Sequence, residues 1–315
     1  MKAIRIHNYG SSEQLKYEEI NIPVINDNQI LVKVYATSVN HLEIKLASGV
    51  MKDVMSLDFP WVPGFDFAGV VESVGKNITG FEKNDEVYGN CNGGSYAEYL
   101  AVDVSKVAKK PNNLSFIAAS SVPHVAETAW QAIHIHGNLQ KGQKVLIHGA
   151  AGAVGAYAVQ FAHRTGAIVY ATASFSNKKL VESLGADFVI DYKNTDFTTV
   201  AHDMDLVVDL VGGETQRKSY LVLKEGGRMV TTVGIQSEDE AKKYKVNAIS
   251  MVIQQSAKNL QIITEMIEKN LISTDVTLVF ALDKAADAWD IINRKDPTTP
   301  PVSHGKIVLE ILKEE

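Results

Sequence analysis

The sequence predicts an α/β protein in which a doubly wound parallel-sheet domain is inserted into a small barrel-like β domain. Residues 1–122 hold short alternating apolar segments separated by glycine corners, a pattern typical of a small barrel. Residues 123–258 instead alternate strand-like and helix-like segments, which predicts a parallel sheet with right-handed crossovers. The final segment alternates again, so we expect it to return to the first domain. The predicted domains are 1–122 with 259–315, and 123–258.

Period-two alternation between turn residues predicts the strands of the first domain. Apolar residues recur at every second position from Ile30 to Val34, and glycines bound the apolar run at 65–74. Two helices with an intervening strand-like segment are expected near the C-terminal end. The expected strands are 1–6, 30–34, 65–74, 86–88, 96–104, 276–280 and 306–311, and the expected helices are 257–269 and 284–294.

Short apolar runs separated by helical stretches predict the second domain. Runs of this length that are rich in β-branched residues are typical of strands buried on both faces of a parallel sheet. The expected strands are 145–148, 168–172, 188–190, 206–210 and 228–233, and the expected helices are 153–164, 177–184 and 215–223.

A glycine turn, GAAGAVG at 149–155, lies between a predicted strand and a predicted helix. The first N–H groups of a helix lack internal partners and carry partial positive charge. Small side chains let a pyrophosphate approach these groups closely, so we expect Gly152, Ala153 and Val154 to bind one. The alternative is an ordinary strand-to-helix turn with small residues for packing.

The residues after the second predicted strand favour NADPH over NADH. An acidic residue at this point binds the ribose 2′-hydroxyl of NAD, but here the chain has Ser174, followed by Lys178 and Lys179. A lysine attracts the 2′-phosphate of NADPH, which a carboxylate would repel. The alternative is that both lysines are solvated helix residues.

Composition and charge exclude several classes of protein. The chain has 315 residues, a formal net charge of −6 and a sequence pI near 5.9, which argue against a nucleic-acid binder or a protein of anionic membranes. No run is long enough for a membrane span, and no signal-peptide core follows the N-terminus. The single cysteine, Cys91, excludes an internal disulfide and is compatible with the cytoplasm.

Further motifs occur in one order along nearly the whole chain. They are VNHLEIK at 39–45, PGFDFAGVV at 63–71, ETAW at 127–130, LGAD at 184–187, VIDY at 189–192, DLVVD at 205–209 and GKIVL at 305–309. With these motifs the chain resembles the medium-chain dehydrogenase/reductase superfamily, in its zinc-independent quinone oxidoreductase and alkenal/enone reductase branch. The resemblance implies a GroES-like catalytic domain at 1–122 and 259–315 and a Rossmann NADP-binding domain at 123–258.

Departures from the zinc alcohol dehydrogenases of that superfamily predict that no metal is bound. Asn40 stands where those enzymes place a zinc-binding cysteine, Phe65 stands in place of the histidine of Gly-His-Glu, and His124 occupies the third ligand position. A catalytic zinc needs three protein ligands, and one histidine does not supply them. We therefore interpret His124 as a pocket or core histidine.

The resemblance also assigns site residues. It implies that Asn40 and Thr128 line the nicotinamide side, with Val233 and Phe280 packed nearby, and that Lys45 anchors a cofactor ribose or a substrate oxygen. Ser174, Lys178 and Tyr192 would surround the 2′-phosphate, and Lys306 would be a cationic partner of the pyrophosphate. Each has a structural alternative: a turn cap for Asn40, a helix N-terminal residue for Thr128, core packing for Tyr192 and Phe280, and a solvated strand position for Lys306.

These observations together predict NADPH-dependent reduction of quinones, or of the activated C=C of enones or alkenals, by hydride transfer without zinc. One alternative is an NADPH-binding regulatory or structural protein with little turnover, and a second is a zinc-type alcohol dehydrogenase. The sequence leaves the proton donor open between Lys45, Tyr88 and solvent. Alternating apolar residues at 245–254 predict an edge strand that pairs across the twofold axis of a homodimer.

Overall fold

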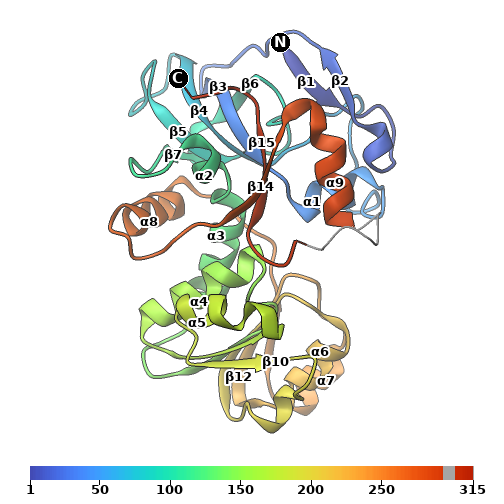
Figure 1. The fold of residues 1–315 in the computed structure, drawn as a ribbon, viewed down its shortest axis with the longest axis vertical. Coiled ribbons are helices and arrows are strands. Elements are labelled where there is room, and N and C mark those ends of the chain that lie inside the picture. Colours follow the sequence, from blue (N-terminus) through green and yellow to red (C-terminus); the bar gives the residue numbers. More distant parts are fainter. Residues whose placement is uncertain (294–301, 315) are drawn as a thin grey trace. The chain divides into compact units, whose positions relative to one another are not determined.

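A computed structural model describes residues 1–293 and 302–314 (Figure 1). The described chain forms two compact units. Unit 1 comprises the described residues of Met1–His124, Gln255–Val302 and Lys306–Glu315, and unit 2 comprises Val125–Gln254 and Ser303–Gly305. Both units combine helices with sheet, as the predicted α/β class requires. Their limits lie a few residues from the boundaries expected after residues 122 and 258.

Unit 1 contains a seven-stranded sheet in the order β14-β15-β3-β4-β5-β7, with β6 beside β3, and a separate β1-β2 pair. The last strand of the chain pairs antiparallel with β3, with Val308 opposite Ser38, and in Figure 1 the red β15 lies beside the blue β3. This confirms the predicted return of the C-terminal strand. The strands are β1 (Lys2–Arg5), β2 (Lys16–Glu19), β3 (Gln29–Ser38), β4 (Asp66–Val74), β5 (Glu86–Asn90), β6 (Tyr99–Asp103), β7 (Val107–Lys109), β14 (Val276–Ala281) and β15 (Lys306–Glu310).

Apolar periodicity builds the core of unit 1. Ile30, Val32 and Val34 of β3 are fully buried, because successive side chains of a strand point to opposite faces. In helix α8, Leu260, Ile263 and Ile267 recur at helical spacing and form one buried face. The helices of unit 1 are α1 (His41–Ala47), α2 (Phe116–Ser120), α8 (Ala257–Glu268) and α9 (Ala285–Asn293).

Unit 2 is built on a six-stranded parallel sheet in the order β10-β9-β8-β11-β12-β13. The five strands predicted for this domain are all present, and the edge strand expected within 245–254 is present as β13. The strands are β8 (Lys144–Ile147), β9 (Ile168–Ala173), β10 (Phe188–Asp191), β11 (Met204–Asp209), β12 (Leu223–Thr231) and β13 (Asn247–Ser250).

Helices connect these strands, and the strand order reverses between β8 and β11. Helix α4 contacts β8 and β9, α5 contacts β9 and β10, α6 contacts β11 and α7 contacts β13. In such a sheet, ligands bind beyond the carboxyl ends of the strands at the reversal. The helices are α3 (Pro123–Trp130), which continues as a π-helical segment (Gln131–His136), α4 (Ala153–Thr165), α5 (Lys178–Ser183), α6 (Gly213–Ser219) and α7 (Glu238–Lys243).

Candidate active site

Asn40 lies in unit 1, between the end of β3 and the start of α1. Its backbone is extended (φ −121°, ψ 147°), which is the N-cap conformation of a helix start. Its N–H donates to Glu43 Oε1 at 2.9 Å, so the third residue of the helix holds the cap from the other side. The capping role that the sequence left as an alternative for Asn40 is therefore present.

Asp66, the first residue of β4, collects hydrogen bonds from three directions. Its Oδ2 accepts from Asn40 Nδ2 at 2.9 Å and from Ser38 Oγ at 2.6 Å, and its Oδ1 accepts from the His124 N–H at 2.7 Å. The side chain has no exposed surface. A buried carboxylate needs such donors to offset its lost hydration.

Lys306, the first residue of β15, brings a buried ammonium to Asn40. Its Nζ donates to Asn40 Oδ1 at 2.6 Å and to the Val39 carbonyl oxygen at 2.8 Å, and it lies 3.6 Å from Asp66 Oδ2. Burial lowers the pKa of Lys306, while the charges of Asp66 and Glu43 act in the opposite direction. The solvated alternative for Lys306 is wrong, because the residue is only 6% exposed. We call Asn40, Asp66 and Lys306 the amide cluster.

A second buried acid lies directly behind Asn40. Glu43 Oε1 accepts from the Tyr96 hydroxyl at 2.7 Å, and the Trp289 indole N–H donates to that hydroxyl at 3.3 Å. Among the described residues, Glu43 Oε2 has no hydrogen-bond partner. Burial raises the pKa of Glu43 to about 8, so the carboxyl is mostly protonated at neutral pH.

The other sequence-predicted residues of unit 1 lie near the amide cluster in the chain or in the sheet. Lys45 is exposed on the last turn of α1, the helix that Asn40 caps. Phe280 lies on β14, paired with Leu309 of the strand that carries Lys306, and packs against the core as the structural alternative expects. Tyr88, one of the proton-donor candidates, points to α8 instead: its hydroxyl hydrogen-bonds Thr264 Oγ1 at 2.8 Å and the Leu260 carbonyl oxygen at 3.1 Å.

The donor set at the three zinc-ligand positions does not fit a metal. Asn40 is hydrogen-bonded to Asp66 and to Lys306, and an ammonium is a poor neighbour for a second cation. Phe65 has no ligand atom, and its ring lies 6.3 Å from that of His124. Within residues 1–293 and 302–314, no group of three His, Cys, Asp or Glu side chains could hold a metal ion.

In unit 2 the glycine turn forms an open helix start. Gly152 is the N-cap of the 13-residue α4 and is exposed, and no side chain caps the helix. A Cβ placed on Gly152 would meet only the Gly149 carbonyl oxygen, at 3.3 Å, so the space beyond the turn is free for an anionic group. Ala153 and Val154 follow in the first turn. This geometry fits the pyrophosphate of a dinucleotide.

The residues expected around the 2′-phosphate follow the two strands beside this turn. Ser174 comes directly after β9, and its Oγ lies 2.9 Å from Ser176 Oγ. Lys178 begins α5 with an exposed ammonium, 3.8 Å from Glu182. Tyr192 comes directly after β10 and is 59% exposed, so it is not a core residue. Because β8, β9 and β10 are parallel, all these residues lie at one edge of the sheet.

A buried hub that sequence reasoning missed holds the neighbouring loops of unit 2. Asp209 Oδ1 accepts from the N–H groups of Val211 and Gly212, and its Oδ2 accepts from Gln216 Nε2 at 2.8 Å. Gln216 also donates to the Gly234 carbonyl oxygen at 2.8 Å, which fixes the loop carrying Val233. Val233 itself is 41% exposed. Thr128 lies on α3, buried.

Two of these residues carried a sequence signal that could have revealed them. Asp66 lies inside the motif at 63–71, in an otherwise apolar strand, and Asp209 ends an apolar strand in the same way. A carboxylate in such a run must find buried partners. The partners of Asp66 come from distant segments and are visible only in the fold. Val211, Gly212 and Gln216, which bind Asp209, lie within seven residues of it.

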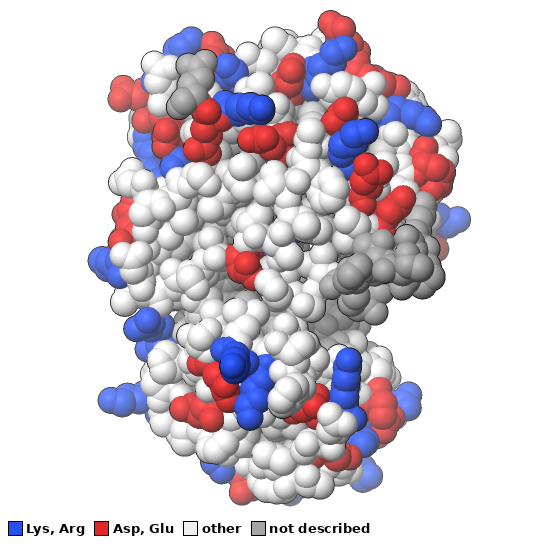
Figure 2. All heavy atoms as spheres, in the orientation of Figure 1, with Lys and Arg blue, Asp and Glu red and all other residues white. Residues whose placement is uncertain are grey.

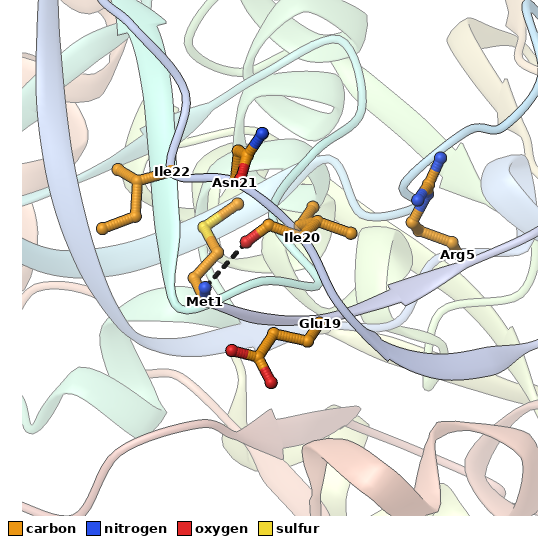
Figure 3. Close-up of a pocket in the computed structure, with 6 residues that line it drawn as sticks. All are labelled: Met1, Arg5, Glu19, Ile20, Asn21 and Ile22. Carbon is orange, nitrogen blue, oxygen red and sulfur yellow. Dashed lines mark hydrogen bonds between the residues drawn. The ribbon is translucent and has the colours of Figure 1, made fainter.

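A surface hollow beside the β1-β2 pair is lined by none of the predicted residues (Figure 3). The Met1 ammonium donates there to the Ile20 carbonyl oxygen at 2.7 Å. The lining residues are Met1, Arg5, Glu19, Ile20, Asn21 and Ile22. Their arrangement holds the N-terminus and offers no catalytic group.

Comparisons with known proteins agree with this geometry. An alcohol dehydrogenase GroES-like domain model matches residues 26–112, and a zinc-binding dehydrogenase model matches residues 184–309. The first range contains Asn40 and Asp66, and the second contains Lys306.

Relatives cover most of the chain. It is 35% identical to the 2-methylene-furan-3-one reductase of Solanum lycopersicum, over 96% of this chain and 79% of that protein. It is 37% identical to the chloroplastic NADPH-dependent alkenal/one oxidoreductase of Arabidopsis thaliana, over 74% of this chain and 63% of that protein. The solved structure of the quinone oxidoreductase from Coxiella burnetii is similar with a TM-score of 0.89 at 29% identity, over 99% of both chains.

Proposed function

Because the chain belongs to the medium-chain dehydrogenase/reductase superfamily, in the branch of the quinone oxidoreductases and alkenal/enone reductases, we propose that it is an NADPH-dependent oxidoreductase that reduces quinones or the activated C=C of enones and alkenals without zinc. The amide cluster carries this proposal. Its Asn40 stands where the zinc enzymes of the superfamily place a cysteine ligand, and the cluster supplies hydrogen-bond donors and a fixed positive charge there instead.

The chemistry suits such a site. When bound, NADPH supplies the hydride. A quinone or an enone spreads the arriving negative charge onto its own carbonyl oxygen, so a hydrogen-bond donor suffices where alcohol oxidation needs a Lewis acid. Asn40 would donate to an oxygen at the reacting centre, and Lys45, exposed on α1, would anchor a cofactor ribose or a substrate oxygen.

The open helix start supports NADPH as the cofactor. Gly152, Ala153 and Val154 would hold the pyrophosphate at the N-terminus of α4. Ser174, Lys178 and Tyr192 would surround the 2′-phosphate, where Lys178 offers the charge. Thr128, Val233 and Phe280 would contact the nicotinamide side. Lys306 would act on the cofactor through the amide cluster, since its ammonium already has two acceptors.

One experiment tests the proposal. Purified protein is mixed with NADPH or NADH and a panel of quinones, enones, alkenals and simple alcohols, and its metal content is measured. We expect NADPH oxidation with members of the first three classes and far less than one zinc per chain. Metal-dependent oxidation of alcohols with NAD would overturn the proposal. Tight NADPH binding with no turnover would favour the regulatory alternative.

We further propose a homodimer in the cytoplasm, with a small electrophile rather than a nucleic acid as partner. β13 is the edge strand of the unit 2 sheet, which supports pairing across a twofold axis. On the face drawn in Figure 2, acidic and basic side chains of the described residues are interspersed. Helices that could span a membrane are absent from the described part of the chain.

A further inference from the structure

The side chain of Asn40 is held at both ends by residues of opposite character. Its Oδ1 accepts from the Lys306 ammonium, and its Nδ2 donates to the Asp66 carboxylate. A lysine ammonium has only donors and a carboxylate has only acceptors. A carboxamide turned by 180° would place N–H groups against the ammonium and its oxygen against the carboxylate. The two neighbours therefore fix which end of the amide is which.

Both neighbours are themselves immobile. Asp66 is anchored by Ser38 Oγ and by the His124 N–H, and it has no exposed surface. Lys306 is anchored by the Val39 carbonyl oxygen and lies at the start of β15, within the sheet. The cluster thus holds Asn40 from two strands and from the end of β3, so the orientation of the amide does not depend on α1 alone.

One of the two Nδ2 hydrogens of Asn40 has no acceptor among the described residues. Nδ2 carries two N–H groups, and among residues 1–293 and 302–314 one acceptor faces them, Asp66 Oδ2. Asn40 keeps 5% of its surface exposed, whereas Asp66 keeps none. Since Oδ1 accepts from Lys306 and one N–H donates to Asp66, the second N–H is the side-chain group left for a ligand oxygen.

We propose that Asp66 and Lys306 are positioning residues that make Asn40 solely a hydrogen-bond donor, directed at a ligand oxygen. The inference rests on the proposed function, because the oxygen belongs either to the carbonyl of the electrophile or to the carboxamide of the nicotinamide. Lys306 and Asp66 act through Asn40 and need not touch the ligand. An amide of reversed polarity would offer an oxygen lone pair to a site where negative charge develops.

An exchange of the two side chains tests the proposal. Asn40→Asp alone sets two carboxylates against one another, and Asp66→Asn alone leaves Lys306 without its counter-ion. We expect each single change to lower the melting temperature by at least about 5 °C. The double variant Asn40→Asp/Asp66→Asn restores one amide, one carboxylate and the ion pair to Lys306. It should recover the thermal stability of the wild type, yet the side chain of residue 40 no longer carries an N–H.

The measurements are melting temperature, NADPH affinity and turnover with the acceptor that wild type uses best. Recovery of stability with kcat still about 100-fold below wild type supports the proposal. An unchanged Kd for NADPH then assigns the oxygen to the electrophile, and a raised Kd assigns it to the nicotinamide. Recovery of both stability and turnover overturns the donor role, and recovery of neither overturns the complementary pairing.

A control separates loss of any side-chain amide hydrogen bond from loss of this one. Asn113 Nδ2 donates to the Ile267 carbonyl oxygen at 2.9 Å elsewhere in unit 1. Asn113→Asp should lower the melting temperature without changing kcat. If wild type oxidises no NADPH with any acceptor, the proposed function fails, while the stability of the exchanged pair still tests the polarity of the amide.

Discussion

The exposed ammonium of Lys178 predicts a preference for NADPH over NADH. Lys178 lies at the start of α5, beside Ser174, and its charge-assisted contact to a 2′-phosphate would be worth about 1.5–3 kcal/mol. Part of this is offset by Glu182 and by solvent, so we expect Lys178→Ala to raise the KM for NADPH about tenfold and to leave that for NADH unchanged. Steady-state kinetics with both cofactors measures this.

The neighbouring lysine provides the matched control. Lys179 is also exposed, but it is not among the residues expected to surround the 2′-phosphate. Lys179→Ala should leave both KM values unchanged. If Lys178→Ala leaves the ratio of the two KM values as it is in wild type, the assignment of the phosphate site by charge is wrong.

Glu43 predicts how stability changes with pH. The folded state holds its proton up to a pKa of about 8, whereas the unfolded chain releases it near 4.5. Between these values the folded state binds more protons, so the free energy of unfolding falls as pH rises, by at most about 1.4 kcal/mol per pH unit. Glu43→Gln removes the ionisation and keeps an oxygen for the Asn40 N–H and the Tyr96 hydroxyl.

The window for this measurement is set by a second buried group. Burial lowers the pKa of His148 from 6.5 to about 4, so protonation of that histidine destabilises the fold only below pH 6.5. Burial lowers the pKa of His41, His124 and His134 as well. Wild type and Glu43→Gln share all these histidines, so the difference between the two proteins in urea unfolding from pH 6.5 to 8 isolates Glu43. We expect wild type to lose about 2 kcal/mol relative to Glu43→Gln across this window. Parallel curves for the two proteins would contradict a buried, protonated Glu43.

Elements were predictable where periodicity was strong. The central strands β8 and β11 of unit 2 are apolar runs that are mostly buried, and α8 carries one apolar stripe, so these elements were visible in the sequence. The short α1 and the exposed β2 were missed, since seven residues barely form two turns and β2 has no fully buried side chain. The edge strand β13 was expected only as part of a longer dimer segment.

One part of the candidate site could be predicted from the sequence and another part could not. The glycine turn was predictable because its meaning depends on local order, a strand before it and a helix after it. The amide cluster was not, because Asn40, Asp66 and Lys306 come from three segments that are far apart in the chain. Lys306 was expected at a pyrophosphate, and its contact with Asn40 follows only from the pairing of β15 with β3.

Gly152 and Gly155, at the start of α4, differ in the space that an added Cβ would find. A Cβ on Gly155 would lie 2.2 Å from the Gly149 carbonyl oxygen and 2.7 Å from Ala150 Cα, both backbone atoms. Gly155→Ala must therefore move the helix from the turn, at a cost of roughly 1–3 kcal/mol. On Gly152 the same Cβ meets one atom, at 3.3 Å, in the space where the pyrophosphate is expected.

Gly155→Ala should therefore lower stability, and Gly152→Ala should lower NADPH affinity. Gly155→Ala should lower the melting temperature by several degrees, whereas Gly152→Ala should nearly keep it and weaken NADPH binding about tenfold or more. Thermal unfolding and fluorescence titration with NADPH measure both. Unchanged NADPH affinity of Gly152→Ala would remove the turn from the cofactor site.

At the scale of the whole molecule, the open edge of the unit 2 sheet predicts how two chains associate. β13 pairs with β12 on one side, and no strand of the described residues pairs with its other side, which leaves a row of backbone groups for a second copy. Val252, just beyond this strand, is 80% exposed, so its apolar side chain is available to a second copy at this edge. A twofold axis at this edge would bring each Val252 close to its copy.

Val252→Asp should therefore shift the protein from dimer to monomer, because two like charges would meet at the interface. Sedimentation velocity at micromolar concentration measures the distribution. The matched control is Val24→Asp, the same change at a valine of unit 1 that is 92% exposed, and it should leave the dimer intact. A wild-type protein that sediments as a monomer removes the proposed dimer. A dimer that persists in Val252→Asp moves the interface away from this strand.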